Sequence, residues 1–219
     1  MNTSDLINLI AAIIILASFP GVIWFFRIRK KMIRKQSILI RFLEEKFKPR
    51  DKTYWYLGYL VGFRAKYKVK RRDVDYVHLL YTTPPYHVFF YLPLIWLFKK
   101  RERLELIYQL GSGSRLRGEA HIANMKIPSI RLSVKADLKD LDSYKKMKLK
   151  ANGVEYSVFY KGGEALDKAK DLLTVMSEKA NVYRVSIDGS RNSILVSFEP
   201  STLESIEHVI DSMRRITGL

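Results

Sequence analysis

Cysteine is absent from this chain of 219 residues, and histidine occurs only four times. Without cysteine the chain has no disulfides, cysteine-thiolate zinc sites, iron–sulfur clusters or cysteine nucleophile. The four histidines, His78, His87, His121 and His208, are scattered and show no metal-ligand spacing. We therefore expect them to have core or surface roles, and we expect no metal or other cofactor.

Signatures of common enzyme classes are missing as well. The sequence contains no Ser–His–Asp order and no Gly-x-Ser-x-Gly elbow. Residues 111–115 resemble a phosphate-binding loop, but the Lys-[Ser/Thr] ending of a P-loop and a following helix are lacking. The carboxylates of residues 137–142 lie in a polar turn with lysines. The sequence thus predicts no enzyme; an enzyme acting on lipid or phosphate groups would need a polar pocket around Arg115 and His121.

Charged residues are also missing from residues 6–26, a run of 21 residues near the N-terminus. As a helix this run is about 31 Å long, which matches a hydrocarbon core of about 30 Å. Its last aromatic residues, beginning at Trp24, directly precede basic residues, as at a membrane interface. A cleaved signal peptide would begin with basic side chains, whereas this chain begins MNTSD. We therefore predict a retained transmembrane anchor in residues 1–26.

Basic residues are concentrated directly after this anchor. Residues 27–72 contain 17 basic and 3 acidic side chains, a net charge of +14 out of +17 for the chain, whereas residues 118–219 contain 16 and 14. Because Lys and Arg stay on the cytosolic side, we expect the N-terminus outside and residues 27–219 in the cytosol, at the plasma membrane of a prokaryote or the ER membrane of a eukaryote. Residues 27–50 are predicted to form a basic juxtamembrane helix. The helix either lies on anionic lipid, at about 1 kcal/mol per basic residue, or only signals topology.

Alternating apolar residues beyond residue 50 predict a cytosolic α+β domain in residues 51–219. An antiparallel sheet with helices packed on one face would bury these patterns. A capping box, Ser201-x-x-Glu204, is predicted to begin the last helix. The predicted strands are 57–69, 74–81, 104–110, 130–134, 147–151, 154–160, 183–187 and 194–198, and the predicted helices are 163–176 and 203–216.

The least ordinary segment is YHVFFYLPLIWLF, residues 86–98, which is followed by three basic residues. A helix of this length reaches about 20 Å and is too short to cross a bilayer. It is either a buried core helix or, as we favour, a membrane-facing interfacial element that binds lipid or a membrane partner. All three tryptophans of the chain adjoin basic clusters, as interface anchors do. The residues predicted to contact the membrane or a partner are Trp24, Trp55, Phe89, Phe90, Leu94 and Trp96.

The basic residues themselves are candidate phosphate ligands. Interleaved aromatic residues such as Trp55 also fit RNA, so ribosomal RNA at a translocation site is an alternative to lipid headgroups. The predicted phosphate-binding residues are Arg27, Arg29, Lys30, Lys31, Arg34, Lys35, Arg64, Lys66, Lys68, Lys70, Arg71, Arg72, Lys99, Lys100 and Arg101.

The order of segments resembles the calumin family of coiled-coil-domain ER proteins. The likeness runs from an N-terminal span through FLEEKF (42–47) and the apolar segment 86–98 to VEYSVFY, VYRVSI and SILVSF, each hairpin leading into a helix. Calumin partners the small membrane protein Asterix in the PAT intramembrane chaperone complex of the multipass translocon. The family's acidic lumenal region and long charged C-terminal helix are missing here, so ribosome contact through that helix is not expected. A compact, archaeal-type relative is expected to look like this.

Two functions follow as expectations. The resemblance implies a non-enzymatic assembly factor or chaperone for multipass membrane proteins, with an Asterix-like multispan partner near the translocon and no small-molecule substrate. The alternative is a membrane-tethered scaffold or regulatory module that binds anionic lipid.

Overall fold

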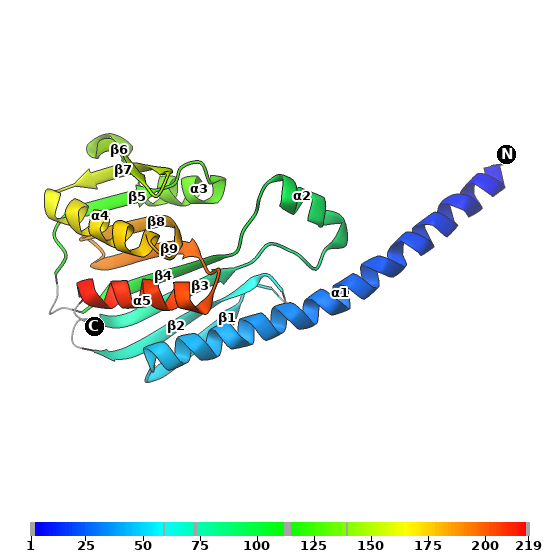
Figure 1. The fold of residues 1–219 in the computed structure, drawn as a ribbon, viewed down its shortest axis with the longest axis horizontal. Coiled ribbons are helices and arrows are strands. Elements are labelled where there is room, and N and C mark those ends of the chain that lie inside the picture. The colour runs from blue at the N-terminus through cyan, green and yellow to red at the C-terminus, as the bar shows by residue number, and fades with distance from the viewer. Residues whose placement is uncertain (1–2, 59, 72–73, 112–114, 139, 218–219) are drawn as a thin grey trace.

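One helix, α1 (Thr3–Phe47), carries both the apolar run and the basic segment (Figure 1). The computed structural model describes residues 3–58, 60–71, 74–111, 115–138 and 140–217. The first part of α1 projects from the rest of the chain, and the 18-residue apolar window in it has no buried residue. Its length and composition suffice for crossing a membrane. The prediction that the basic segment continues the apolar helix is confirmed as far as Phe47.

Within the described residues, nine antiparallel strands form the sheet of an α+β domain. Their order across the sheet is β1-β2-β3-β4-β9-β8-β5-β7-β6, which leaves β1 and β6 at the edges. The strands are β1 (Asp51–Tyr56), β2 (Gly62–Arg71), β3 (Val74–Thr82), β4 (Arg103–Leu110), β5 (Glu119–Ala123), β6 (Lys145–Ala151), β7 (Val154–Lys161), β8 (Asn181–Asp188) and β9 (Ser193–Glu199). The remaining helices are η1 (Phe89–Tyr91), α2 (Leu92–Leu97), α3 (Pro128–Asp137), η2 (Leu141–Ser143), α4 (Gly163–Ser177) and α5 (Leu203–Thr217).

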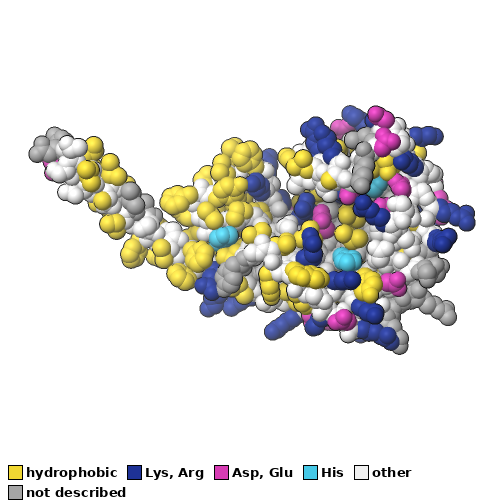
Figure 2. Space-filling view, turned by 180° about the vertical axis from the view of Figure 1, so that it is seen from behind, with side chains coloured by type: hydrophobic (Ala, Val, Ile, Leu, Met, Phe, Trp, Pro, Cys, Tyr) yellow, Lys and Arg dark blue, Asp and Glu magenta, His cyan; other side chains and the backbone are white. Residues whose placement is uncertain are grey.

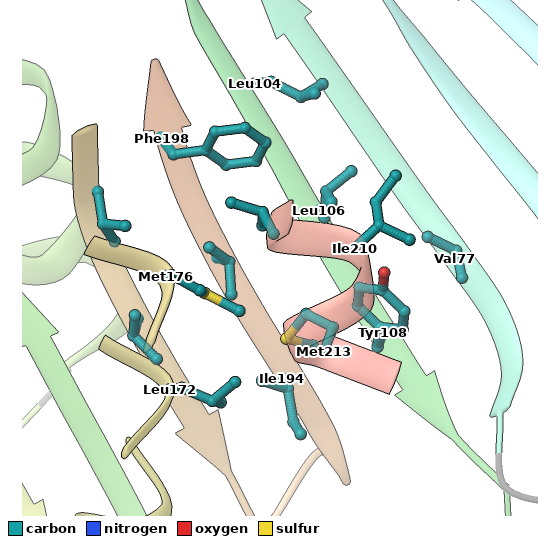
Figure 3. Packing of buried hydrophobic residues seen from close by; sticks show 14 of the residues in the cluster. Val77, Leu104, Leu106, Tyr108, Leu172, Met176, Ile194, Phe198, Ile210 and Met213 are labelled. Carbon is teal, nitrogen blue, oxygen red and sulfur yellow. The ribbon is translucent and has the colours of Figure 1, made fainter. Parts of the chain in front are cut away.

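The main core lies between the sheet and the helices α4, α5 and the last part of α1. Figure 3 shows Met176 of α4 and Ile210 of α5 in one cluster with Leu106 and Phe198 of the neighbouring strands β4 and β9. Leu43 of α1 is completely buried in the same cluster. Burial of each such side chain contributes about 1.5–3 kcal/mol. The same core therefore joins the projecting helix to the sheet without a linker between them.

The predicted strand 57–69 is wrong in its first part. The chain forms β1, turns, and returns as β2, with the Leu57 N–H donating to the Gly62 carbonyl oxygen at 3.1 Å. Gly62 has φ +145°, and a Cβ atom there would lie 1.9 Å from the Tyr81 carbonyl oxygen. The glycines of the run thus provide a turn that the apolar alternation concealed. Arg64, Lys66 and Lys68 share the other face of β2, since Ala65 and Tyr67 between them are buried.

The predicted strand 130–134 is a helix, α3, whose Ile130 and Val134 are buried and whose Leu132 is 68% exposed. Pro128 begins it, as is common at the first helical turn. The helix packs with Ala123, whereas Ala120 and Ile122 of the same strand belong to the main core. Since successive strand residues face opposite sides, α3 covers the other face of the sheet. The prediction of helices on one face holds for α4 and α5 and is wrong for α3.

Two smaller predictions also need correction. Strand β5 was missed because it is only five residues long and its burial does not alternate: four of its five residues are buried. The cap of α5 lies one residue later than predicted: the Ser205 N–H donates to Thr202 Oγ1 at 3.1 Å, and the Thr202 N–H donates to Ser205 Oγ at 3.2 Å. Leu203, directly after this cap, is 44% exposed.

Candidate membrane- and partner-binding site

Between β3 and β4 the chain leaves the sheet and forms a projecting segment, residues 86–98, which we call the wedge (Figure 1). It consists of η1 and α2, and Pro93 lies in the first turn of α2, where proline is tolerated. Ile95 is buried, whereas Phe90, Trp96 and Leu97 are 73–75% exposed. The wedge is therefore no buried core helix, and that alternative is wrong.

The wedge is held against α1. Trp24 Nε1–H donates to the Tyr86 carbonyl oxygen at 2.8 Å, and the Trp24 ring meets the Phe89 ring edge-on at 6.2 Å between centroids. At the base of the wedge Glu102 accepts a hydrogen bond from the Tyr81 hydroxyl at 2.8 Å and pairs with Lys35 Nζ at 2.7 Å. These contacts fix the wedge at two places, which we call its tip (residues 86–90, beside Trp24) and its base (the chain around Glu102, beside Lys35).

The tip of the wedge lies beside the apolar part of α1. His87, Phe89 and Phe90 line a shallow pocket together with Gly21 and other α1 residues before Arg27. Gly21 and Arg27 are six positions apart, which is about 9 Å along a helix. A membrane whose headgroups met Arg27 would therefore also contain the tip of the wedge. Interfacial elements lie at comparable depths, about 5–10 Å.

Basic side chains surround the base of the wedge. Figure 2 shows the hydrophobic side chains of α1 and the wedge with lysines and arginines beside them. Arg27, Lys30, Lys31 and Arg34 are exposed on α1, as are Lys99, Lys100 and Arg101 after the wedge, while Arg29 is half-buried. Lys35 is already paired with Glu102, and Lys100 Nζ donates to the Tyr91 hydroxyl at 2.6 Å.

The other predicted phosphate ligands form a second group. Arg64, Lys66 and Lys68 lie on the sheet face away from α1, where Lys66 Nζ is 4.1 Å from the centre of the Tyr76 ring. Burial, followed by the charges of Lys66 and Arg64, lowers the pKa of His78 on the neighbouring strand. The structure thus divides the predicted basic set between the wedge and the open face of the sheet.

The remaining predicted residues fall partly outside these two groups. Leu94 is 40% exposed on the wedge. Trp55, on the edge strand β1 and 48% exposed, pairs with Arg64 across the strands and takes no part in the wedge. The side chains of Lys70 and Arg71, and all of Arg72, lie outside the described residues.

A buried polar network under α3 has no counterpart among the predictions. The Arg184 side chain, 1% exposed, donates to Asp137, Ser133 and Ser186. His121 is buried on β5, where burial, followed by the charge of Arg184, lowers its pKa to about 4. The sequence signal for this network is the alternation of polar with apolar residues along β5 and β8, because the polar residues lie on the face that α3 covers. This network joins α3 to the sheet, and Arg115 is exposed elsewhere.

No group of three or more His, Asp or Glu side chains within the described residues could hold a metal ion. No protein-family model matches this chain, and no curated protein matches its sequence. The resemblance to the calumin family therefore stays a prediction.

Proposed function

We propose that this protein is a membrane-anchored, non-enzymatic assembly factor or chaperone for multipass membrane proteins. In this proposal α1 spans the membrane with its N-terminus outside, and the sheet domain lies in the cytosol. The wedge enters the cytosolic leaflet and binds apolar segments of client proteins. The observation that carries the proposal is the exposed wedge held beside a helix able to span a membrane.

The exposure of the wedge supports a binding role. Phe90, Trp96, Leu97 and Phe98 are 64–75% exposed in one short segment. Large contiguous apolar patches on a protein surface mark membrane or partner contacts. Aromatic side chains such as Trp96 are the residue type that most often dominates binding energy at interfaces. Because Trp24 of α1 contacts Phe89 on one side of the wedge, the exposed side is available for a client helix.

The resemblance to the calumin family specifies this proposal further. It suggests a small multispan, Asterix-like partner beside the translocon, where the basic side chains also adjoin ribosomal RNA. Phosphate binding by a basic surface needs no sequence-specific readout.

The exposed basic side chains of α1 and of residues 99–101 favour a second candidate function, a scaffold or regulatory module held on anionic lipid. Exposed cations near a membrane surface contribute about 1 kcal/mol each to such binding. In that case the wedge would contact lipid and no client protein.

Photocrosslinking in native membranes tests the first proposal. Benzoylphenylalanine placed at the exposed position 96 is expected to crosslink a multispan membrane protein, whereas the same group in place of Leu132 on α3, which is also exposed, is not. A Phe90→Glu variant is expected to lose the crosslink and Leu132→Glu to retain it. Crosslinks to lipid alone would overturn the chaperone role and support the scaffold. Crosslinks only within the chain would contradict both.

Anchoring is tested separately by alkaline carbonate extraction of the membranes. The full chain is expected to stay in the pellet, because about 21 apolar residues of α1 would span the bilayer. Release into the supernatant would overturn the anchoring on which both candidate functions depend.

A further inference from the structure

A groove runs along α1 where the wedge meets it. Its volume is about 800 Å³, within the range of about 300–1,000 Å³ typical of small-molecule sites. One end is apolar and the other is basic. The apolar lining comes from Pro20, Ile23, Trp24, Ile28 and Phe89, and the basic lining from Arg27, Lys30, Lys31 and Arg34.

The basic end of the groove has no internal counter-charge. Among the described residues, no carboxylate lies within ion-pair distance of Arg27, Lys30, Lys31 or Arg34. Lys35, one residue further along α1, pairs with Glu102. Arg27 and Arg34 are seven residues apart, so their attachment points lie within about 10 Å along the helix. Four cations over this distance would strongly favour a phosphate group.

The apolar end of the groove is fixed before any ligand binds. The hydrogen bond from Trp24 Nε1 to Tyr86 holds the indole in place, and Phe89 packs against it. Preorganised walls reduce the entropy that binding would otherwise cost. The walls continue toward Pro20 and Ile23, which belong to the apolar run of α1. An acyl chain could therefore pass from the groove into the bilayer.

We propose that this groove binds one anionic glycerophospholipid, with its phosphate headgroup at Arg27, Lys30, Lys31 and Arg34 and its upper acyl chain at Ile23, Trp24 and Phe89. The inference rests on the membrane anchoring proposed above and does not depend on the chaperone role. RNA would use the basic end alone and would leave the apolar end empty. The apolar half of the lining is the reason for preferring a lipid.

Native mass spectrometry of the full chain in neutral detergent tests the proposal. With phosphatidylglycerol we expect one retained lipid, bound at least tenfold more tightly than phosphatidylcholine. The combined variant Lys30→Gln, Lys31→Gln and Arg34→Gln is expected to lose this tenfold preference. A control with the same loss of charge, Lys126→Gln, Lys135→Gln and Lys145→Gln at exposed positions elsewhere, is expected to change it less than twofold.

A second variant separates a lipid site from a purely electrostatic surface. Phe89→Ala leaves every charge in place and is expected to weaken phosphatidylglycerol retention at least threefold, with unchanged far-UV circular dichroism. If Phe89→Ala has no effect, or if millimolar inorganic phosphate or a short RNA displaces the lipid fully, the groove recognises phosphate and the proposal fails. Equal retention of the two lipids would also overturn it. Failure of anchoring itself would show in carbonate extraction instead.

Discussion

Removal of the Asp137 carboxylate is expected to destabilise the domain strongly. Arg184 is among the largest fully buried side chains, and its guanidinium has three partners: Asp137 Oδ2 at 2.7 Å, Ser133 Oγ at 2.8 Å and Ser186 Oγ at 2.7 Å. Substitution of Asp137 would leave a buried cation with two neutral hydrogen bonds. Breaking a buried ion pair in this way costs about 3–5 kcal/mol.

The partial exposure of Asp137 lowers this expected cost. The Asp137 side chain is 32% exposed, so water can partly replace the carboxylate. Asparagine also keeps one oxygen as an acceptor. We therefore expect Asp137→Asn to lower the free energy of unfolding by about 2 kcal/mol and Asp137→Ala by about 3 kcal/mol. The loss corresponds to about 30-fold and 150-fold in the folding equilibrium.

Urea unfolding of the full chain in detergent micelles, followed by far-UV circular dichroism, measures the effect. Asp142→Asn is the matched control, because the Asp142 side chain is 97% exposed and contacts Lys146 at 3.4 Å; we expect it to change the unfolding free energy by less than about 0.5 kcal/mol. Replacing Arg184 with Met in the Asp137→Ala background should recover part of the loss. A change below about 0.5 kcal/mol for Asp137→Asn would refute the reasoning.

Three further predictions concern pH and the backbone. Burial, followed by the charge of Arg184, lowers the pKa of His121 to about 4, so the unfolded chain takes up a proton on this side chain before the folded protein does as pH falls. The free energy of unfolding is therefore expected to fall by up to about 3 kcal/mol between pH 6.5 and 4. Urea unfolding midpoints of His121→Gln should show less of this loss. The hydrogen bonds from Lys52 and then Tyr54 lower the pKa of Glu44 below 4.5, so its stabilisation is present above pH 4.5 and lost as pH falls through the folded-state pKa; a Glu44→Gln variant with an unchanged acid transition would contradict this. Gly62→Ala should cost more than about 2 kcal/mol in the unfolding free energy, because its Cβ would collide with the Tyr81 carbonyl, whereas Gly153→Ala, with open space at φ +76°, should cost about 1 kcal/mol.

The fold was predictable wherever one side of an element is buried and the other is exposed. The hairpins and helices of the last part of the chain follow such patterns, and the structure confirms them. The errors fall where an element is buried on both faces, or where the spacing of apolar residues fits both a strand and a helix. Strand β5 is buried on both faces, and Ile130, Leu132 and Val134 alternate like a strand although positions 130 and 134 also share a helix face.

The candidate site was predictable in its composition but not in its arrangement. The wedge was recognisable because thirteen largely apolar residues without a charge precede a basic run. The contacts of Trp24 with Tyr86 and of Lys35 with Glu102 join positions more than sixty residues apart in the sequence, and no local pattern encodes such distances. The same holds for the separation of Arg64, Lys66 and Lys68 from the basic residues of α1.

The sequence by itself determined that this chain has an apolar helix long enough to span a membrane and a basic segment directly after it. These properties depend on local composition, which hydropathy and charge report directly. Only the tertiary structure decided that the wedge lies beside that helix with its aromatic side chains exposed, and that the groove between them is apolar at one end and basic at the other. Both features arise from side chains that lie far apart in the sequence, on α1 and in the segment whose two ends are held together by the pairing of β3 with β4.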